Sequence, residues 1–164
     1  MADYKDISVL IVDDNDMTRE TLRVILRHDG YNVVGEALDG DSALEMATRL
    51  KPDIILLDVV MPKVSGIEAL KSIRMVMHDV FVLMVTANTD QEVVAEVVKS
   101  GIGGYIIKPF NAKKVLDAVE KVVDKVRANR KQKAANSGVN WSTKVVSWTR
   151  IFLRNEFRNN AKKV

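Results

Sequence analysis

The sequence predicts an α/β domain in which helices cover both faces of a parallel, doubly wound sheet. Short apolar runs, typical of strands buried on both faces, alternate five times with segments whose apolar residues recur at helical spacing. Breakers such as Gly30, Pro52 and the pair Gly103-Gly104 separate several of these segments. Because β-α-β crossovers are right-handed, this alternation favours a parallel sheet with helices on both faces.

The first half of the chain supplies two strands and two helices. Residues 7–12 form a β-type run, and the helix that follows has apolar residues at i, i+3 and i+4 before it stops at Gly30. Residues 31–37 predict a second strand. Residues 41–50 predict a second helix, which ends at Pro52 because proline cannot continue a helix.

The second half supplies the remaining elements. Residues 54–57 are four consecutive apolar residues that predict a third strand, with Asp58 at its carboxyl end. Gly66 leads into a third helix. The sequence then predicts a strand over 80–85, a helix over about 91–99, a strand over 105–107 and a long helix from near Ala112.

Length and composition suit one ordinary domain with an appendage. Apolar residues make up 47% of the 164 residues, which is enough for a hydrophobic core. The absence of cysteine excludes disulfides and thiolate metal sites. The polar, partly acidic start does not resemble a signal peptide, and no apolar run approaches the roughly 20 residues of a membrane helix. We therefore expect a cytoplasmic protein.

Charge divides the chain into two parts. Residues 127–164 hold ten lysines or arginines and one acid, a net charge of +9, whereas the preceding residues hold 15 bases and 21 acids, a net charge of −6. We expect a domain over 1–130 and a basic linker and tail over 131–164, partly helical or disordered. A tail of this length is too short to build a core of its own.

Chemically distinctive residues follow four of the five predicted strands. Asp13-Asp14 follow the first strand, and Asp58, Thr86 and Lys108 follow the third, fourth and fifth. Each residue alone has an ordinary interpretation, such as a helix-capping acid or a turn. Because ligands of open α/β sheets bind at the carboxyl ends of the strands, their joint placement predicts one functional crevice.

The residue types at this edge favour phosphate chemistry. Three close carboxylates repel one another unless a cation joins them, and Mg²⁺ is the hard ion that accepts both carboxylate and phosphate oxygens. Lys108 could bind another phosphate oxygen, and Thr86 could offer its hydroxyl group. Asp58 would then be a nucleophile toward phosphorus, forming an acyl phosphate.

Residues 7–126 resemble the receiver domain of two-component response regulators, of the chemotaxis-receiver, single-domain type. The matching features are Asp13-Asp14 after the first strand, Asp58 followed by Met61-Pro62 and Gly66, Thr86-Ala87, and Lys108-Pro109. The resemblance covers about three quarters of the chain. It implies a flavodoxin-like fold with strand order 2-1-3-4-5.

The resemblance also implies roles for individual residues. Asp58 would accept a phosphoryl group from a partner histidine kinase or phosphotransfer protein. Mg²⁺ would be held by Asp13, Asp14, Asp58 and the main-chain carbonyl of Val60, and the phosphoryl group would be contacted by Thr86, Ala87 and Lys108.

A conformational switch is a further implication of the resemblance. The hydroxyl of Thr86 would turn toward the phosphoryl group, and Tyr105 would rotate inward. This would change the surface of the fourth helix, fifth strand and fifth helix, which would regulate a downstream protein or form a homodimer. Leu116 and Val123 give the fifth helix more apolar surface than one buried side needs, which favours a partner face.

The resemblance also implies that two positions set the lifetime of the phosphorylated state. They lie two residues beyond the phosphoacceptor and two beyond the threonine, and here they are Val60 and Asn88. The side chain of Val60 cannot hydrogen-bond an attacking water, whereas that of Asn88 can. We therefore expect slower dephosphorylation than in family members with polar groups at both positions.

Two other classes of function compete with a signalling domain that is not an enzyme. A Mg²⁺-dependent phosphatase with an aspartyl-phosphate intermediate is disfavoured because Val59-Val60 follow Asp58, with no acid two residues on. A regulator that contacts DNA or membrane through the basic tail is disfavoured by the length of the tail and by its uneven apolar pattern.

Overall fold

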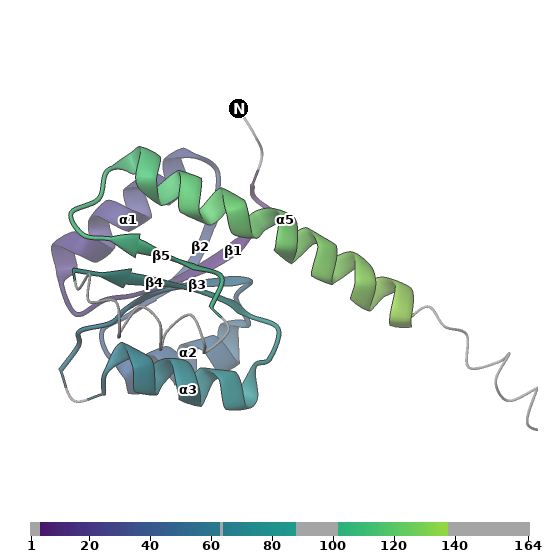
Figure 1. The fold of residues 1–164 in the computed structure, drawn as a ribbon, viewed down its shortest axis with the longest axis horizontal. Coiled ribbons are helices and arrows are strands. Elements are labelled where there is room, and N and C mark those ends of the chain that lie inside the picture. The colour runs from purple at the N-terminus through teal and green to yellow at the C-terminus, as the bar shows by residue number, and fades with distance from the viewer. Residues whose placement is uncertain (1–3, 63, 88–101, 138–164) are drawn as a thin grey trace, which may run out of the picture. The chain divides into compact units, whose positions relative to one another are not determined.

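The computed structural model describes residues 4–62, 64–87 and 102–137 (Figure 1). The elements in chain order are β1 (Ser8–Val12), α1 (Asp16–His28), β2 (Asn32–Ala37), α2 (Gly40–Leu50), β3 (Ile54–Asp58), α3 (Gly66–Val76), β4 (Phe81–Thr86), β5 (Gly104–Ile107) and α5 (Ala112–Ser137). All five predicted strands and four of the five predicted helices are therefore present. The helix predicted over 91–99 lies outside the described residues, as do Asn88 and residues 138–164.

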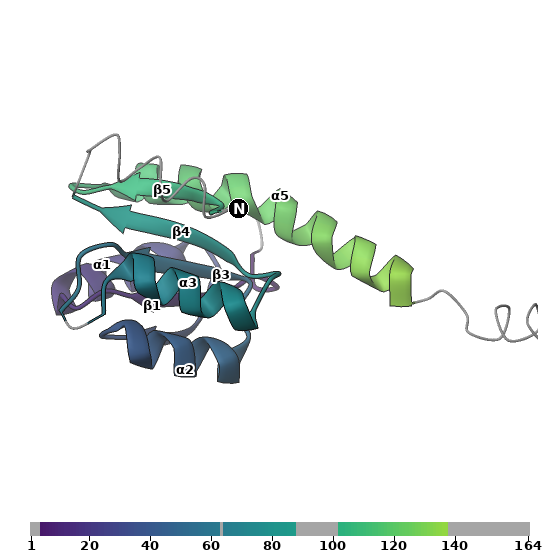
Figure 2. The ribbon, with the colours of Figure 1, turned by 60° about the horizontal axis from the view of Figure 1, so that its bottom comes forward.

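The five strands form one parallel sheet in the order β2-β1-β3-β4-β5. This confirms the predicted fold class and strand order. Figure 2 shows β3 between β1 and β4. The register pairs Asp58 at the end of β3 with Val85 on β4, and Thr86 at the end of β4 with Ile107 on β5. The carboxyl ends of these three strands therefore meet at one edge.

A hydrophobic layer lies on each face of the sheet. Helices α1 and α5 cover one face and α2 and α3 cover the other (Figures 1 and 2). Strand residues alternate between the layers, so that Leu83 and Val85 pack toward α1 and α5 while Val82 and Met84 pack toward α2 and α3. β3 is buried along its whole length, as its continuous apolar run predicts.

Helix caps explain where three of the helices begin. The Asn15 side chain accepts a hydrogen bond from the Thr18 N–H at the start of α1. Asp39 caps α2 and Ser65 caps α3, each through a reciprocal capping box. After α1, Gly30 has a φ of 91°, which glycine adopts without steric cost, so it turns the chain into β2.

The prediction that Leu116 and Val123 mark a partner face on α5 is in part wrong. Val123 is only 2% exposed and belongs to the core between α5 and the sheet, because α5 packs more than one narrow stripe against β5 and α1. Leu116 is partly buried against the same core. α5 continues to Ser137, past the boundary predicted at residue 130, and that boundary stays a prediction. Within the described ranges, no helix combines the length and apolar character needed to span a membrane.

Candidate functional site

The predicted site residues converge at the carboxyl edge of the sheet. Asp13 follows the last residue of β1, Asp58 and Thr86 are the last residues of β3 and β4, and Lys108 follows β5. A main-chain hydrogen bond of 2.7 Å, donated by the Lys108 N–H to the Thr86 carbonyl, ties the last two strand ends together. Residues up to 95 positions apart in sequence therefore meet in space.

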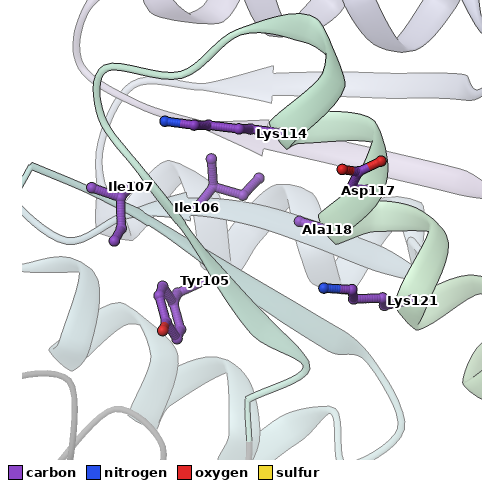
Figure 3. Close-up of a pocket in the computed structure, with 7 residues that line it drawn as sticks. All are labelled: Tyr105, Ile106, Ile107, Lys114, Asp117, Ala118 and Lys121. Atoms are coloured by element: carbon purple, nitrogen blue, oxygen red, sulfur yellow. The ribbon is translucent and has the colours of Figure 1, made fainter.

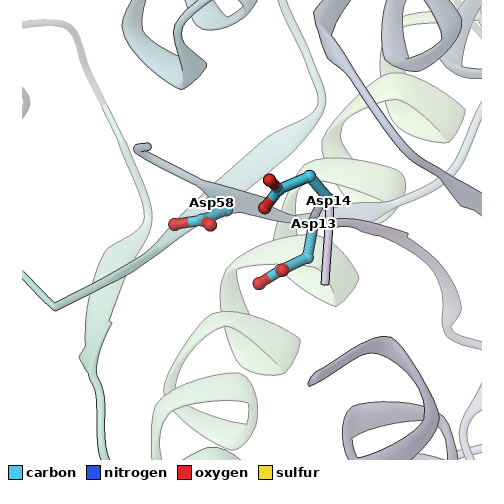
Figure 4. Close-up of side chains that lie close together, drawn as sticks. All are labelled: Asp13, Asp14 and Asp58. Atoms are coloured by element: carbon cyan, nitrogen blue, oxygen red, sulfur yellow. The ribbon is translucent and has the colours of Figure 1, made fainter. Parts of the chain in front are cut away.

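Three carboxylates form the centre of the site (Figure 4). One oxygen of each of Asp13, Asp14 and Asp58 lies within 4.8 Å of the other two. Asp13 is fully buried and Asp58 is 4% exposed, whereas Asp14 is exposed at the mouth of the site. The cluster is thus built from two buried acids and one that faces solvent.

Lys108 bridges the two buried carboxylates. Its Nζ donates hydrogen bonds to Oδ2 of Asp13 at 2.7 Å and to Oδ2 of Asp58 at 3.1 Å. The other oxygen of Asp13 accepts the Asn15 N–H at 2.9 Å, and Oδ1 of Asp58 accepts the Val60 N–H at 3.3 Å. Three carboxylates and one ammonium group leave an excess of negative charge in a partly buried pocket.

Burial and charge act in opposite directions on the groups of this site. Burial raises the pKa of Asp58 above its ordinary value and the charge of Asp13 adds to this, while the hydrogen bond and charge of Lys108 lower it. Burial alone would lower the pKa of Lys108, but its bonds to Asp13 and Asp58 prevail, so the pKa of Lys108 is raised. The lysine therefore stays protonated between the two acids.

The main chain around Asp58 is tightly packed against the start of α3. A Cβ atom placed on Gly66 would lie 1.9 Å from the Asp58 carbonyl oxygen, so no larger residue fits without moving that backbone. The Gly66 N–H also donates to the Val59 carbonyl at 3.0 Å. Glycine at position 66 thus allows α3 to approach and support the turn after β3.

The residues of the predicted switch lie near this edge. Thr86 is buried and Ala87, which follows it, is exposed. Tyr105 pairs in register with Met84, two residues before Thr86, so alternation places Tyr105 and Thr86 on the same sheet face. Tyr105 is 48% exposed. Its role in the switch stays a prediction.

Val60 projects into solvent beside the acidic cluster, with 65% of its surface exposed. It therefore lies where a side chain could meet water approaching Asp58. Asn88, the second residue expected to tune dephosphorylation, lies outside the described residues, and both roles remain predictions.

Sequence reasoning missed one residue of this neighbourhood. Arg19 on α1 is 8% exposed and its Nη1 donates a hydrogen bond of 2.8 Å to the main-chain carbonyl of Asp13. Arg19 lies in the first turn of α1, and long helical side chains point back toward the helix N-terminus, but this position does not distinguish it from a surface arginine.

The donor set fits a small hard cation. The cluster offers carboxylate oxygens without nitrogen or sulfur ligands, and Mg²⁺ prefers one or two carboxylates while keeping some of its own waters. The excess negative charge and the exposed position of Asp14 both favour a divalent ion at the mouth of the site. The residues present therefore agree with the predicted cofactor.

Comparison with known proteins gives consistent matches over the same region. The profile of the response regulator receiver domain matches residues 9–120. The chemotaxis protein CheY of Thermotoga maritima is 40% identical over 114 residues, which are 70% of this chain and 95% of that protein. The chemotaxis protein CheY of Bacillus subtilis is 35% identical over 116 residues, which are 71% of this chain and 97% of that protein.

A solved structure extends the match to three dimensions. The CheX-CheY-BeF₃-Mg²⁺ complex from Borrelia burgdorferi contains a chain that superposes with a TM-score of 0.70 at 33% sequence identity. The match covers 71% of this chain and 89% of that one.

Proposed function

This chain belongs to the family of response regulator receiver domains, and from that premise we propose that it is a switch activated by phosphorylation of Asp58. The phosphoryl donor would be a histidine kinase or phosphotransfer protein of a two-component system. The family is a signalling family of the chemotaxis CheY type. The phosphorylated chain would act by regulating a protein partner.

The arrangement around Asp58 is the observation that carries the proposal. A single lysine bridges two buried carboxylates, and one of these, Asp58, ends a strand at the open edge of the sheet. Asp58 is held by hydrogen bonds from Lys108 and the Val60 N–H, which fix its carboxylate in one direction. A preorganised, buried carboxylate beside a lysine cation is suited to phosphoryl acceptance.

The transfer itself would exchange one bond for another. A carboxylate oxygen of Asp58 bonds to phosphorus while the bond from phosphorus to the donor's imidazole nitrogen breaks, and the imidazole keeps the electron pair and takes up a proton. Lys108 would then bind a phosphoryl oxygen, and the Thr86 hydroxyl and the Ala87 main chain would donate to others. Mg²⁺ held by Asp13, Asp14, Asp58 and the Val60 carbonyl would supply positive charge for the transferred group.

The output surface would include β5 and α5. The two elements line a cavity with a volume of about 290 Å³. Figure 3 shows the side chains that line it. The cavity is bordered by Tyr105, Ile106, Ile107, Lys114, Asp117, Ala118 and Lys121. Rotation of Tyr105 would change the wall of this cavity, so a partner could sense the state of Asp58 there. A homodimer through the same surface is an alternative use of it.

The lifetime of the phosphorylated state would depend on Val60. An apolar, exposed side chain beside Asp58 cannot orient an attacking water, so we propose slow dephosphorylation. The half-life of the phosphorylated protein should shorten in Val60→Asn. An unchanged half-life would remove Val60 from this role.

Phosphate incorporation from a small phosphodonor with Mg²⁺ tests the proposal as a whole. The wild type should take up one stable phosphoryl group, and Asp58→Asn should take up none. Labelling that persists in Asp58→Asn would contradict the proposal. Rapid turnover of many phosphoesters without stable labelling would instead support a phosphatase.

A further inference from the structure

Arg19 is a buried charged residue that the proposed phosphotransfer chemistry does not use. Its side chain is 10% exposed, and a guanidinium so far removed from water needs several partners to compensate for lost hydration. Nη1 donates to the Asp13 carbonyl at 2.8 Å, and this hydrogen bond is itself buried. The guanidinium therefore contacts the main chain of the acidic cluster.

Two acids hold the guanidinium of Arg19 in place. Nη2 pairs with Asp16 in the first turn of α1, and Nε lies 3.5 Å from Oε2 of Glu36 on β2. The other oxygen of Glu36, Oε1, accepts a separate hydrogen bond of 3.0 Å from Nη1 of Arg23. Ion pairs with Asp16 on α1 and Glu36 on β2 thus flank the guanidinium group beside its hydrogen bond to Asp13, and Nε itself makes no hydrogen bond among the described residues.

The Asp13 carbonyl controls how Asp14 is presented. It belongs to the planar peptide unit that joins Asp13 to Asp14, so fixing it fixes the direction in which the chain enters Asp14. The Asp13 carboxylate is held independently by Lys108 and by the Asn15 N–H. In the described part of the chain, no hydrogen bond or ion pair holds the Asp14 carboxylate, so its position depends on its backbone.

We propose that Arg19 is a positioning residue that orients the Asp13-Asp14 peptide so that the Asp14 carboxylate faces the divalent cation. The proposal rests on the cation site of the proposed function and adds to it a residue that touches neither the ion nor the phosphoryl group. Partners that orient metal ligands typically change metal affinity 10–100-fold when removed, so an effect of about tenfold is expected.

The charge of Arg19, taken alone, predicts the opposite change in Mg²⁺ affinity, so the sign of the change tests the proposal. Removing a positive charge near three carboxylates strengthens cation binding by simple electrostatics. Removing a positioning hydrogen bond weakens it, because Asp14 must then be ordered when the ion binds. The direction of the change in Mg²⁺ affinity therefore separates the two roles.

Calorimetric titration of the full-length chain with Mg²⁺ alone measures this direction. Arg19→Met keeps the aliphatic stem but loses the guanidinium, and its dissociation constant should rise about tenfold. Arg23→Met is the matched control. Arg23 lies on the same helix as Arg19 and also pairs with Glu36, but it does not contact Asp13. Arg23→Met should bind Mg²⁺ as the wild type does.

Equal or tighter Mg²⁺ binding by Arg19→Met would overturn the proposal. So would an equal loss of affinity in Arg19→Met and Arg23→Met, since that would show general destabilisation. If Arg19→Met does not fold, Arg19→Lys replaces it. The lysine ammonium can still donate to the Asp13 carbonyl but cannot also hold Asp16 and Glu36, so an intermediate loss of Mg²⁺ affinity is expected. An unchanged Mg²⁺ affinity in Arg19→Lys would contradict the proposal. Failure of the wild type to bind Mg²⁺ would instead reject the cation site of the proposed function.

Discussion

The two edges of the sheet differ in how their polar groups are paired. At the amino edge, Tyr4 and Tyr31 stack with ring centroids 4.4 Å apart and an interplanar angle of 5°, and the Tyr4 hydroxyl donates to Glu120 at 2.7 Å. Asp53 at this edge accepts hydrogen bonds from both the N–H and the hydroxyl of Ser8, at 2.8 and 2.6 Å. The Tyr4 hydroxyl and the Asp53 carboxylate therefore each have a hydrogen-bond partner of their own.

At the carboxyl edge, acids outnumber their partners. Asp13 and Asp58 share one lysine, and Asp14 adds a third carboxylate within 4.8 Å. Like charges placed together in a buried site reduce stability, and such sites are common where a protein binds ions or carries out chemistry. The comparison indicates that the amino edge stabilises the fold, while the carboxyl edge gives up stability for reactivity.

The largest effect on stability is expected at the amino edge, from Tyr31→Ala. Tyr31 is 3% exposed and its ring packs on Tyr4, so truncation should lower the free energy of unfolding by about 3–5 kcal/mol. Urea denaturation measures this change. Phosphorylation per folded molecule should be retained, and its loss would show that the two edges are not independent.

Gly66→Ala tests the support beneath Asp58. A methyl group there would meet the Asp58 carbonyl oxygen at 1.9 Å, so the backbone must shift at a cost of about 3 kcal/mol. Unlike Tyr31→Ala, this variant should also be phosphorylated more slowly, because the backbone shift moves the phosphoacceptor Asp58. Normal phosphorylation kinetics in a folded Gly66→Ala protein would refute the positioning of Asp58 by α3.

Asp58→Asn should stabilise the protein in the absence of divalent ions. Burial raises the pKa of Asp58, so the folded state binds a proton more tightly than the unfolded state and the ionised carboxylate lowers stability. Lys108 keeps its hydrogen bond to Asp13 in this variant, so removing the charge of Asp58 should raise the free energy of unfolding at pH 7.

The gain in Asp58→Asn should depend on pH in a defined direction. The gain in stability is fully present above the pKa that Asp58 has in the folded state. The gain shrinks as pH falls through that pKa toward the ordinary pKa of an aspartate, because residue 58 of the wild type then becomes neutral as well. Thermal denaturation of both proteins across this range, without Mg²⁺, gives the difference. A variant less stable than the wild type at pH 7 would contradict the account of the carboxyl edge.

Tyr4→Phe should have the smallest effect. It removes only the hydroxyl that donates to Glu120 and keeps the ring stacked on Tyr31, so the expected loss is about 0.5–1 kcal/mol. Comparison with Tyr31→Ala in the same denaturation assay separates the hydrogen bond from the aromatic packing. Equal losses in the two variants would show that the stack contributes little.

The sequence predicted the sheet and the residues at its carboxyl edge because both follow from local patterns. Apolar runs mark buried strands, and the residue after each run lies at the edge where strands of a parallel sheet end together. Asp58, Thr86 and Lys108 could be placed in this way without any tertiary information.

Other features depend on contacts that no local pattern reveals. Tyr4 and Glu120 are 116 residues apart, so their hydrogen bond could not be read from spacing. Arg19 resembles any surface arginine of an amphipathic helix until its distance to the Asp13 carbonyl is known. Val123 was assigned to a partner face because the extent of packing between α5 and the sheet cannot be deduced from the helix alone.

Chemical trapping of the acyl phosphate tests the central claim most directly. Borohydride reduces an aspartyl phosphate to homoserine, and peptide mass spectrometry then identifies the position. After treatment with a small phosphodonor and Mg²⁺, homoserine should appear at position 58 and should be absent when either reagent is omitted. Homoserine at position 13 or 14 instead, or at no position in a protein that has incorporated phosphate, would contradict the assignment of Asp58 as the phosphoacceptor.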